Sequence, residues 1–170
     1  MKVFGIIGGC RGKAGLVQGL VRHLTAKGLT VSTIKRVGDD LDLDRPGKDT
    51  YCQREAGARQ IIVANSFRWA LMHERTDLFD EPEVEPLVAR LDPVDLVLVE
   101  GFRLAPYPKI EVVMAGSDRR RQQLDDPTVI ALASDLPLEL PSDCFDLGDI
   151  TGIARFIERH AARFRAAVPA

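Results

Sequence analysis

The first part of the chain alternates between short apolar runs and one amphipathic stretch. Residues 2–7 are an apolar run with the length of a buried strand, and from Leu16 to Leu24 the apolar positions recur at helical spacing. Gly28 ends this predicted helix, and residues 30–34 have the composition of a second strand. The pattern therefore predicts an opening β-α-β unit with parallel strands and a right-handed connection.

Further along, the pattern predicts a β-hairpin and a short helix before it. Residues 60–64 and 67–74 are predicted as two strands joined by Asn65 and Ser66. Phe67, Trp69 and Leu71 alternate along the second strand, which favours one packed sheet face, with a dimer surface as the sharper alternative. The preceding helix is predicted over residues 50–58, with Asp49 as its N-cap.

In the second half of the chain, the apolar pattern predicts more strands and a final helix. Residues 95–102 combine a continuous apolar run with a terminal acid, as in a central strand of an α/β sheet. Residues 109–114 and 129–133 are predicted as further strands. A helix is expected over residues 151–165, whose apolar positions lie on one face: Ile153, Ile157, Ala161 and Phe164.

Length and composition restrict the function classes. The 170 residues suit one domain, 1–170, with a continuous core. A net charge of -2, from 23 basic and 25 acidic residues, provides no overall field for nucleic acid. The 3 cysteines, at positions 10, 52 and 144, indicate a reducing compartment. Without a signal-peptide pattern or an apolar stretch of membrane-spanning length, we expect a cytoplasmic protein with no membrane partner.

The turn after the first strand has the features of a phosphate-binding loop. Backbone N–H groups at a helix start can bind an anion, and a lysine there adds a full charge. The pattern G-x-x-x-x-G-K-[ST] is broken twice, because Ile7 replaces its first glycine and Ala14 replaces the hydroxyl residue that holds Mg²⁺. The alternative is a glycine-rich turn that only permits close packing. The candidate ligand-binding residues are Gly8, Gly9, Cys10, Arg11, Gly12, Lys13, Ala14 and Gly15.

Acidic side chains follow other predicted strands at the same edge of the sheet. Glu100 ends the central strand, and Asp39, Asp40 and Asp42 lie in the loop after residue 34. Carboxylates suit Mg²⁺, so Glu100 with Asp40 or Asp42 is the candidate metal set. The alternative for the aspartates is a solvated charged loop.

Three more residues are candidates for ligand contacts. Ser134 and Asp135 follow a predicted strand and could hydrogen-bond a guanine edge, or could form a plain turn before residue 137. Lys48 could contact phosphate or pterin, or could be a surface lysine beside an N-cap. The histidines have no spacing that indicates a metal site.

Several of these segments, in order, resemble the family of molybdopterin-guanine dinucleotide biosynthesis adaptor proteins, MobB. The resemblance rests on these segments: Gly12-Lys13, Ile34-Lys35, the D-x-D-x-D-x-P-G-K-D run at 40–49, Ala56-Gly57-Ala58, R-W-A-L-M at 68–72, V-E-G-F at 99–102 and Ser134-Asp135. It covers the chain from the N-terminus to about residue 137. Family members commonly have G-K-T-T in the loop and T-H-H at 37–39, both of which this chain lacks.

The resemblance implies a fold and a set of partners. The fold is an α/β, P-loop NTPase-like three-layer sandwich with a mostly parallel central sheet and a β-hairpin. The implied ligands are GTP, Mg²⁺ and molybdopterin or its guanine dinucleotide, with weak hydrolysis at most. The implied partners are a MobA-like guanylyltransferase and a second copy of the chain. Lys13 and Gly12 would hold phosphate, and Glu100 would face Mg²⁺.

Two other interpretations compete with that of a nucleotide-binding adaptor. One is a degenerate, non-hydrolysing carrier or scaffold for pterin or for molybdoenzyme maturation. The other is an independent P-loop kinase or NTPase, which Ala14 disfavours because it removes the metal-binding hydroxyl.

Overall fold

The computed structural model describes residues 1–38, 44–75, 81–115, 126–136 and 143–164. The chain forms two compact units, one from residues 1–36 and 83–170 and a smaller one from residues 37–82. Among the described residues, no helix is long and apolar enough to cross a membrane.

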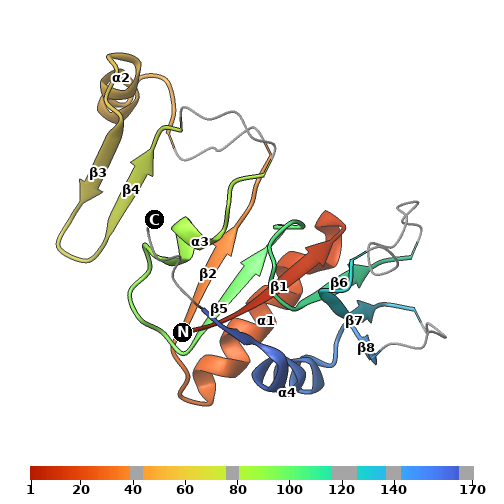
Figure 1. Ribbon diagram of the computed structural model, residues 1–170. Helices are drawn as coiled ribbons and strands as arrows, with labels where there is room; N and C mark the ends of the chain where they lie inside the picture. Colours follow the sequence, from red (N-terminus) through yellow and green to blue (C-terminus); the bar gives the residue numbers. More distant parts are fainter. Residues whose placement is uncertain (39–43, 76–80, 116–125, 137–142, 165–170) are drawn as a thin grey trace, which may run out of the picture. The chain divides into compact units, whose positions relative to one another are not determined.

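The larger unit is built on a mostly parallel sheet, as expected from the sequence. Its strands are β1 (Lys2–Gly8), β2 (Val31–Lys35), β5 (Leu96–Glu100), β6 (Lys109–Val113), β7 (Val129–Ser134) and β8 (Asp143–Asp146), in the order β2-β5-β1-β6-β7-β8, with β9 (Ala162–Arg163) paired to β1. All neighbours on the main path are parallel, and among the described strands of this sheet only β9 is antiparallel. Because β5 lies between β1 and β2, the carboxyl ends of these strands meet at one edge (Figure 1).

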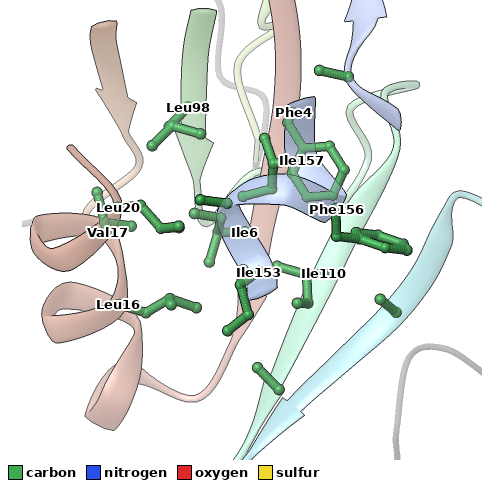
Figure 2. Packing of buried hydrophobic residues seen from close by; sticks show 14 of the residues in the cluster. Phe4, Ile6, Leu16, Val17, Leu20, Leu98, Ile110, Ile153, Phe156 and Ile157 are labelled. Atoms are coloured by element: carbon green, nitrogen blue, oxygen red, sulfur yellow. The ribbon is translucent and has the colours of Figure 1, made fainter. Parts of the chain in front are cut away.

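Strand alternation sends side chains of β1 and β5 into two separate cores. On one face, α1 (Cys10–Ala26) and α4 (Ile150–His160) cover the sheet. Phe4 and Ile6 of β1 and Leu98 of β5 pack there against both helices (Figure 2). On the other face, Val3 and Val97 pack with α3 (Glu85–Val88) and with residues of the segment that follows β5.

The smaller unit pairs a short helix with a hairpin. It contains α2 (Asp49–Glu55), β3 (Gln60–Ala64) and β4 (Trp69–His73), and the two strands are antiparallel. Asp49 is the first helical residue and not the N-cap, which is Lys48 without a side-chain hydrogen bond. The buried carboxylate of Asp44 instead ties this helix to the preceding loop, because its Oδ1 accepts from Thr50 Oγ1 at 2.7 Å.

The hairpin face expected to be packed is open in the single chain. Phe67 belongs to the turn and not to the strand, since Asn65 Oδ1 accepts from the backbone N–H groups of Phe67 and Arg68. Trp69 is 64% exposed and Ile62 is 65% exposed. Ile61 is the one buried hydrophobic residue in the described part of this unit.

The C-terminal segment differs from its sequence pattern. The helix ends at His160, and Ala161 and Phe164 therefore lie outside it. Ala161 has an extended ψ of 127°, and β9 then pairs with Lys2 and Val3 of β1. The helical spacing of these apolar residues does not distinguish a helix from a strand that packs at the same core.

Candidate phosphate-binding site

The junction of β1 and α1 leaves an open helix N-terminus at the sheet edge. Gly8 has φ +112°, and a Cβ there would lie 2.1 Å from the carbonyl oxygen of Val112. Gly12 also has positive φ, +87°, so the first turn of α1 departs from a regular helix. Gly9 is the N-cap with no side-chain hydrogen bond, and the first turn has no acidic residue. The first N–H groups of α1 are therefore not capped by its own N-cap side chain, as an anion site requires.

Lys13 is the central side chain of this site. It is 8% exposed, and among the described residues no hydrogen bond or ion pair joins it to another side chain. Its Nζ lies above Gly101, 3.7 Å from the place that a Cβ of residue 101 would take. A buried ammonium without a partner is costly, and an anionic ligand would remove that cost.

Glu100 ends the neighbouring strand and is 7% exposed. It lines a pocket of about 500 Å³ between α1 and β2, and Ala14 lines the same pocket. The segment after Glu100 is anchored by Tyr107, whose hydroxyl hydrogen-bonds Glu85 of α3. Burial, followed by the charge and the hydrogen bond of Glu85, raises the pKa of Tyr107 to about 12, so the hydroxyl keeps its proton.

Ser134 and Asp135 lie at the end of β7, and each has a structural contact. Ser134 is 4% exposed, and its Oγ accepts from the backbone N–H of Leu136 at 3.0 Å. Asp135 is exposed, and its Oδ1 accepts from the backbone N–H of Ala115 at 2.9 Å. The plain-turn alternative thus describes part of their role, while Asp135 Oδ2 has no hydrogen bond to the described residues.

Strand register brings several predicted site residues to one edge of the sheet. Gly8 pairs with Val112, which in turn pairs with Ala133, so the loop and Ser134 are separated by one strand. Glu100 pairs with Ile6, two residues before Gly8. The glycine loop, Glu100 and the Ser134-Asp135 turn therefore lie along the same carboxyl edge, where α/β sheets bind ligands.

The remaining predicted residues are the aspartates after β2, Lys48 and the other positions of the glycine loop. Asp39, Asp40 and Asp42 lie outside the described residues. Lys48 belongs to the smaller unit. Cys10 and Arg11 are the first two residues of α1. Gly9 and Gly15 have free space where a Cβ would point, so packing alone does not require glycine there.

The described residues do not fit a Mg²⁺ ion held by the protein. Ala14 presents a methyl group where the P-loop pattern has a metal-binding hydroxyl. Glu100 is the carboxylate of the pocket beside it. In the described ranges no cluster of three or more His, Cys, Asp or Glu side chains is arranged to hold a metal. At phosphate sites Mg²⁺ is bound by one or two carboxylates together with phosphate oxygens, so Glu100 without the loop hydroxyl is too small a donor set to hold the ion by itself.

The comparison with known families agrees with this geometry. The model of the family described as molybdopterin guanine dinucleotide synthesis protein B matches residues 3–135. The chain belongs to this family. The predicted resemblance is thereby confirmed, and the matched region includes the glycine loop, Glu100 and the Ser134-Asp135 turn.

Curated relatives of the MobB family align with most of the chain. It is 42% identical over 149 residues to the molybdopterin-guanine dinucleotide biosynthesis adapter protein of Escherichia coli, covering 86% of this chain and 85% of that protein. The protein of the same name from Haemophilus influenzae is 35% identical over 158 residues, covering 92% and 86%.

Solved MobB structures confirm the predicted fold class. Bacillus subtilis MobB superposes with a TM-score of 0.72 at 20% identity, covering 95% of this chain and 98% of that one. The MobB homolog of Bacillus stearothermophilus gives 0.67 at 22% identity, covering 94% and 97%. At these identities the likeness concerns the fold alone.

Ile34-Lys35 is one of the segments that carry the resemblance, but no ligand contact was predicted for Lys35, which also lines the pocket beside Glu100. Lys35 ends β2 and pairs with Glu100 across the parallel strands. Its position after an apolar strand was a usable signal. The insertion of β5 between β1 and β2 was not visible, because neighbouring strands need not be consecutive in sequence.

Proposed function

We propose that this protein is an accessory protein of molybdopterin guanine dinucleotide biosynthesis that binds a guanine nucleotide, or the nucleotide-bearing cofactor, at the loop 8–15. The observation that carries the proposal is Lys13, a buried ammonium without a partner among the described residues, at an uncapped helix N-terminus. Family membership supports the pathway, and curated relatives carry the name of adapter proteins in it. The partner would be a MobA-like guanylyltransferase, and the compartment would be the cytoplasm.

A second candidate is a non-hydrolysing carrier or scaffold for pterin or for molybdoenzyme maturation. Ala14 favours it, because the pocket at the loop has a methyl group in place of a metal-binding hydroxyl. Valine side chains from α1 and β2 also line this pocket, which would suit a flat ring as well as a phosphate. The two candidates differ in whether a free guanine nucleotide binds.

Calorimetric titration with GTP, GDP and ATP tests the proposal, and Asp135→Asn tests the base contact. We expect GTP to bind more tightly than ATP, because guanine offers two donors to a carboxylate, whereas adenine leaves that acceptor unpaired. The expected preference is about ten- to hundredfold. Asparagine keeps the Oδ1 that accepts from Ala115, so loss of the preference would report recognition and not a broken turn.

Equal affinity of the wild type for GTP and ATP would remove the base-recognition assignment. A variant that keeps the full guanine preference would do the same. Binding of molybdopterin without binding of any free nucleotide would favour the carrier.

Turnover is expected to be very slow or absent. Phosphoryl transfer depends on positioning and on charge compensation, and Ala14 lacks the hydroxyl that helps to place a metal. Ala14→Thr should raise Mg²⁺-dependent binding or hydrolysis, measured as phosphate release, with Ala14→Val as a control of similar size and shape. Wild-type hydrolysis of GTP at about 1 per second or faster, as in active enzymes, would contradict this expectation.

The protein is expected to be a homodimer through the β3–β4 hairpin. Ile62 and Trp69 are exposed hydrophobic side chains, and a two-stranded hairpin is marginally stable without further packing. A stable interface would bury about 1,600 Å² or more. Sedimentation at micromolar concentration should give a dimer mass, and Trp69→Asp should shift it to the monomer while the exposed Arg68→Ala should not. A clean wild-type monomer would rule out the dimer.

A further inference from the structure

The pocket beside the phosphate loop is lined at one end by Lys35, a cation to which the proposed function gives no role. Its volume is about 500 Å³, and it lies between α1 and the edge strand β2. Ala14 and Arg22 both line it from α1. They are eight residues apart, about 12 Å along a helix. Glu100 and Lys35 line the pocket from the carboxyl ends of their strands, the edge at which the phosphate loop begins.

Lys35 and Glu100 are direct neighbours across parallel strands. They pair in the β2–β5 register, and the N–H of Arg36 donates to the carbonyl oxygen of Glu100 at 2.8 Å. Paired residues of parallel strands project to the same face, and adjacent strands are about 4.8 Å apart. On the other side Glu100 pairs with Ile6, which packs beneath α1. Both charged side chains therefore project toward α1 and the loop.

The charges at this end are unbalanced for a phosphate chain. A polyphosphate held by Lys13 would lie near the buried carboxylate of Glu100, and like charges at short range repel strongly where water is excluded. The P-loop pattern places a metal beside its hydroxyl, a position where this chain has only the methyl group of Ala14. A cation in addition to Lys13 would offset the charge of Glu100 when a phosphate chain binds.

We propose that Lys35 is a second phosphate-binding cation, which offsets Glu100 and lets this site bind polyphosphate ligands without a divalent metal. Lys35 is exposed, and it lies on β2 directly beside Glu100 of β5. From this position its ammonium can reach either the Glu100 carboxylate or a phosphate oxygen. The inference rests on the proposed function in one respect, that phosphate binds at Lys13. It adds which residue replaces the metal and predicts that chelators leave binding intact.

Calorimetric titration of the full chain with GTP and with inorganic tripolyphosphate tests the inference, each in EDTA and in excess Mg²⁺. The wild type should bind with affinities that differ less than about threefold between the two conditions. Lys35→Ala should lose about tenfold or more in EDTA, as expected for one charge-assisted contact. Lys27→Ala removes the same charge outside the pocket, at the C-cap of α1 where Lys27 pairs with Glu158, and should stay within about twofold of the wild type. Thermal unfolding checks that each variant is folded.

A coupled variant separates the role of Lys35 from general electrostatics. In Lys35→Ala, the additional change Ala14→Thr should restore affinity in Mg²⁺ but not in EDTA, because it supplies the missing hydroxyl. Wild-type affinity in the single Lys35→Ala variant, or wild-type binding that requires Mg²⁺, would overturn the inference. An equal loss in Lys27→Ala would also overturn it, because the effect would then be one of net charge.

The two ligands distinguish this inference from the proposed function. If tripolyphosphate binds and depends on Lys35 while no guanine preference is found, the guanine-nucleotide function fails and the role of Lys35 stands. If GTP binding depends on Lys13 and not on Lys35, the proposed function stands and this inference fails. If neither ligand binds under either condition, both are wrong.

Discussion

Replacing Lys13 by alanine is expected to weaken the binding of GTP about ten- to hundredfold while the fold stays intact. The physical reason is the state of the ammonium, which is 8% exposed and has no partner among the described residues. A charge-assisted contact to phosphate contributes about 1.5 to 3 kcal/mol, which corresponds to that loss of affinity. The measurement is calorimetric titration of variant and wild type.

Two controls make the Lys13 result specific. Lys13→Met keeps most of the buried stem, so the same loss of affinity in both variants would assign it to the charge and not to packing. Lys27→Ala removes an exposed lysine at the C-cap of the same helix, where it pairs with Glu158, and should leave nucleotide affinity unchanged. Unchanged affinity in a folded Lys13→Ala variant would show that the loop is only a packing turn.

Asp126→Ala is expected to destabilise the protein by about 3 kcal/mol, because it removes the anion that neutralises a buried lysine. Lys109 is 1% exposed, lies against Gly5 of β1 and donates to Asp126 Oδ2 at 3.0 Å and to the hydroxyl of Thr128. Asp126 Oδ1 also accepts from the N–H and hydroxyl of Thr128. Urea unfolding measures the change in free energy.

The double variant Lys109→Met/Asp126→Ala should recover most of that loss. A buried ion pair can be replaced by apolar groups at little cost, whereas an uncompensated buried charge cannot. Methionine also keeps an unbranched stem against Gly5. A double variant as unstable as Asp126→Ala would instead assign the loss to the Thr128 turn.

The same ion pair predicts how stability depends on pH. Desolvation raises the pKa of Asp126, but the hydrogen bonds of Thr128 and the nearby Lys109 ammonium outweigh it and hold this pKa below the ordinary 3.8. The unfolded chain therefore binds the proton more readily than the folded chain. This contribution to stability is fully present above pH 3.8 and is lost as the pH falls through the lower folded pKa. In urea titrations, the wild type should lose its advantage over Asp126→Ala in that acidic range.

Elements with a strong local pattern were predicted well. The continuous apolar run before Glu100 is β5, and the run at the N-terminus is β1. Both are central strands buried on two faces, which requires apolar residues at every position. The hairpin was also predicted, although Phe67 was placed in its strand, because the turn set by Asn65 is longer than two residues.

Elements that depend on distant partners were missed or extended too far. β8 has the sequence Asp-Cys-Phe-Asp, which contains no apolar run, and its strand conformation comes from pairing with β7. β9 has two residues and exists because it pairs with the start of β1. The predicted last helix extends beyond His160, because Ala161 and Phe164 keep helical spacing. In the structure the helix ends at His160 and the chain turns toward β1.

The sequence by itself determined the family, the glycine loop with its lysine and the strand that ends in Glu100, because each depends on residues that are adjacent in the chain. Tertiary structure alone decided what surrounds them. Strand order placed Lys35 beside Glu100, and a backbone contact from Ala115 occupied one oxygen of Asp135. Lys35 and Glu100 are 65 positions apart in the chain, and Ala115 and Asp135 are 20 positions apart. Such contacts follow from non-local strand pairing and loop packing, which no local pattern encodes.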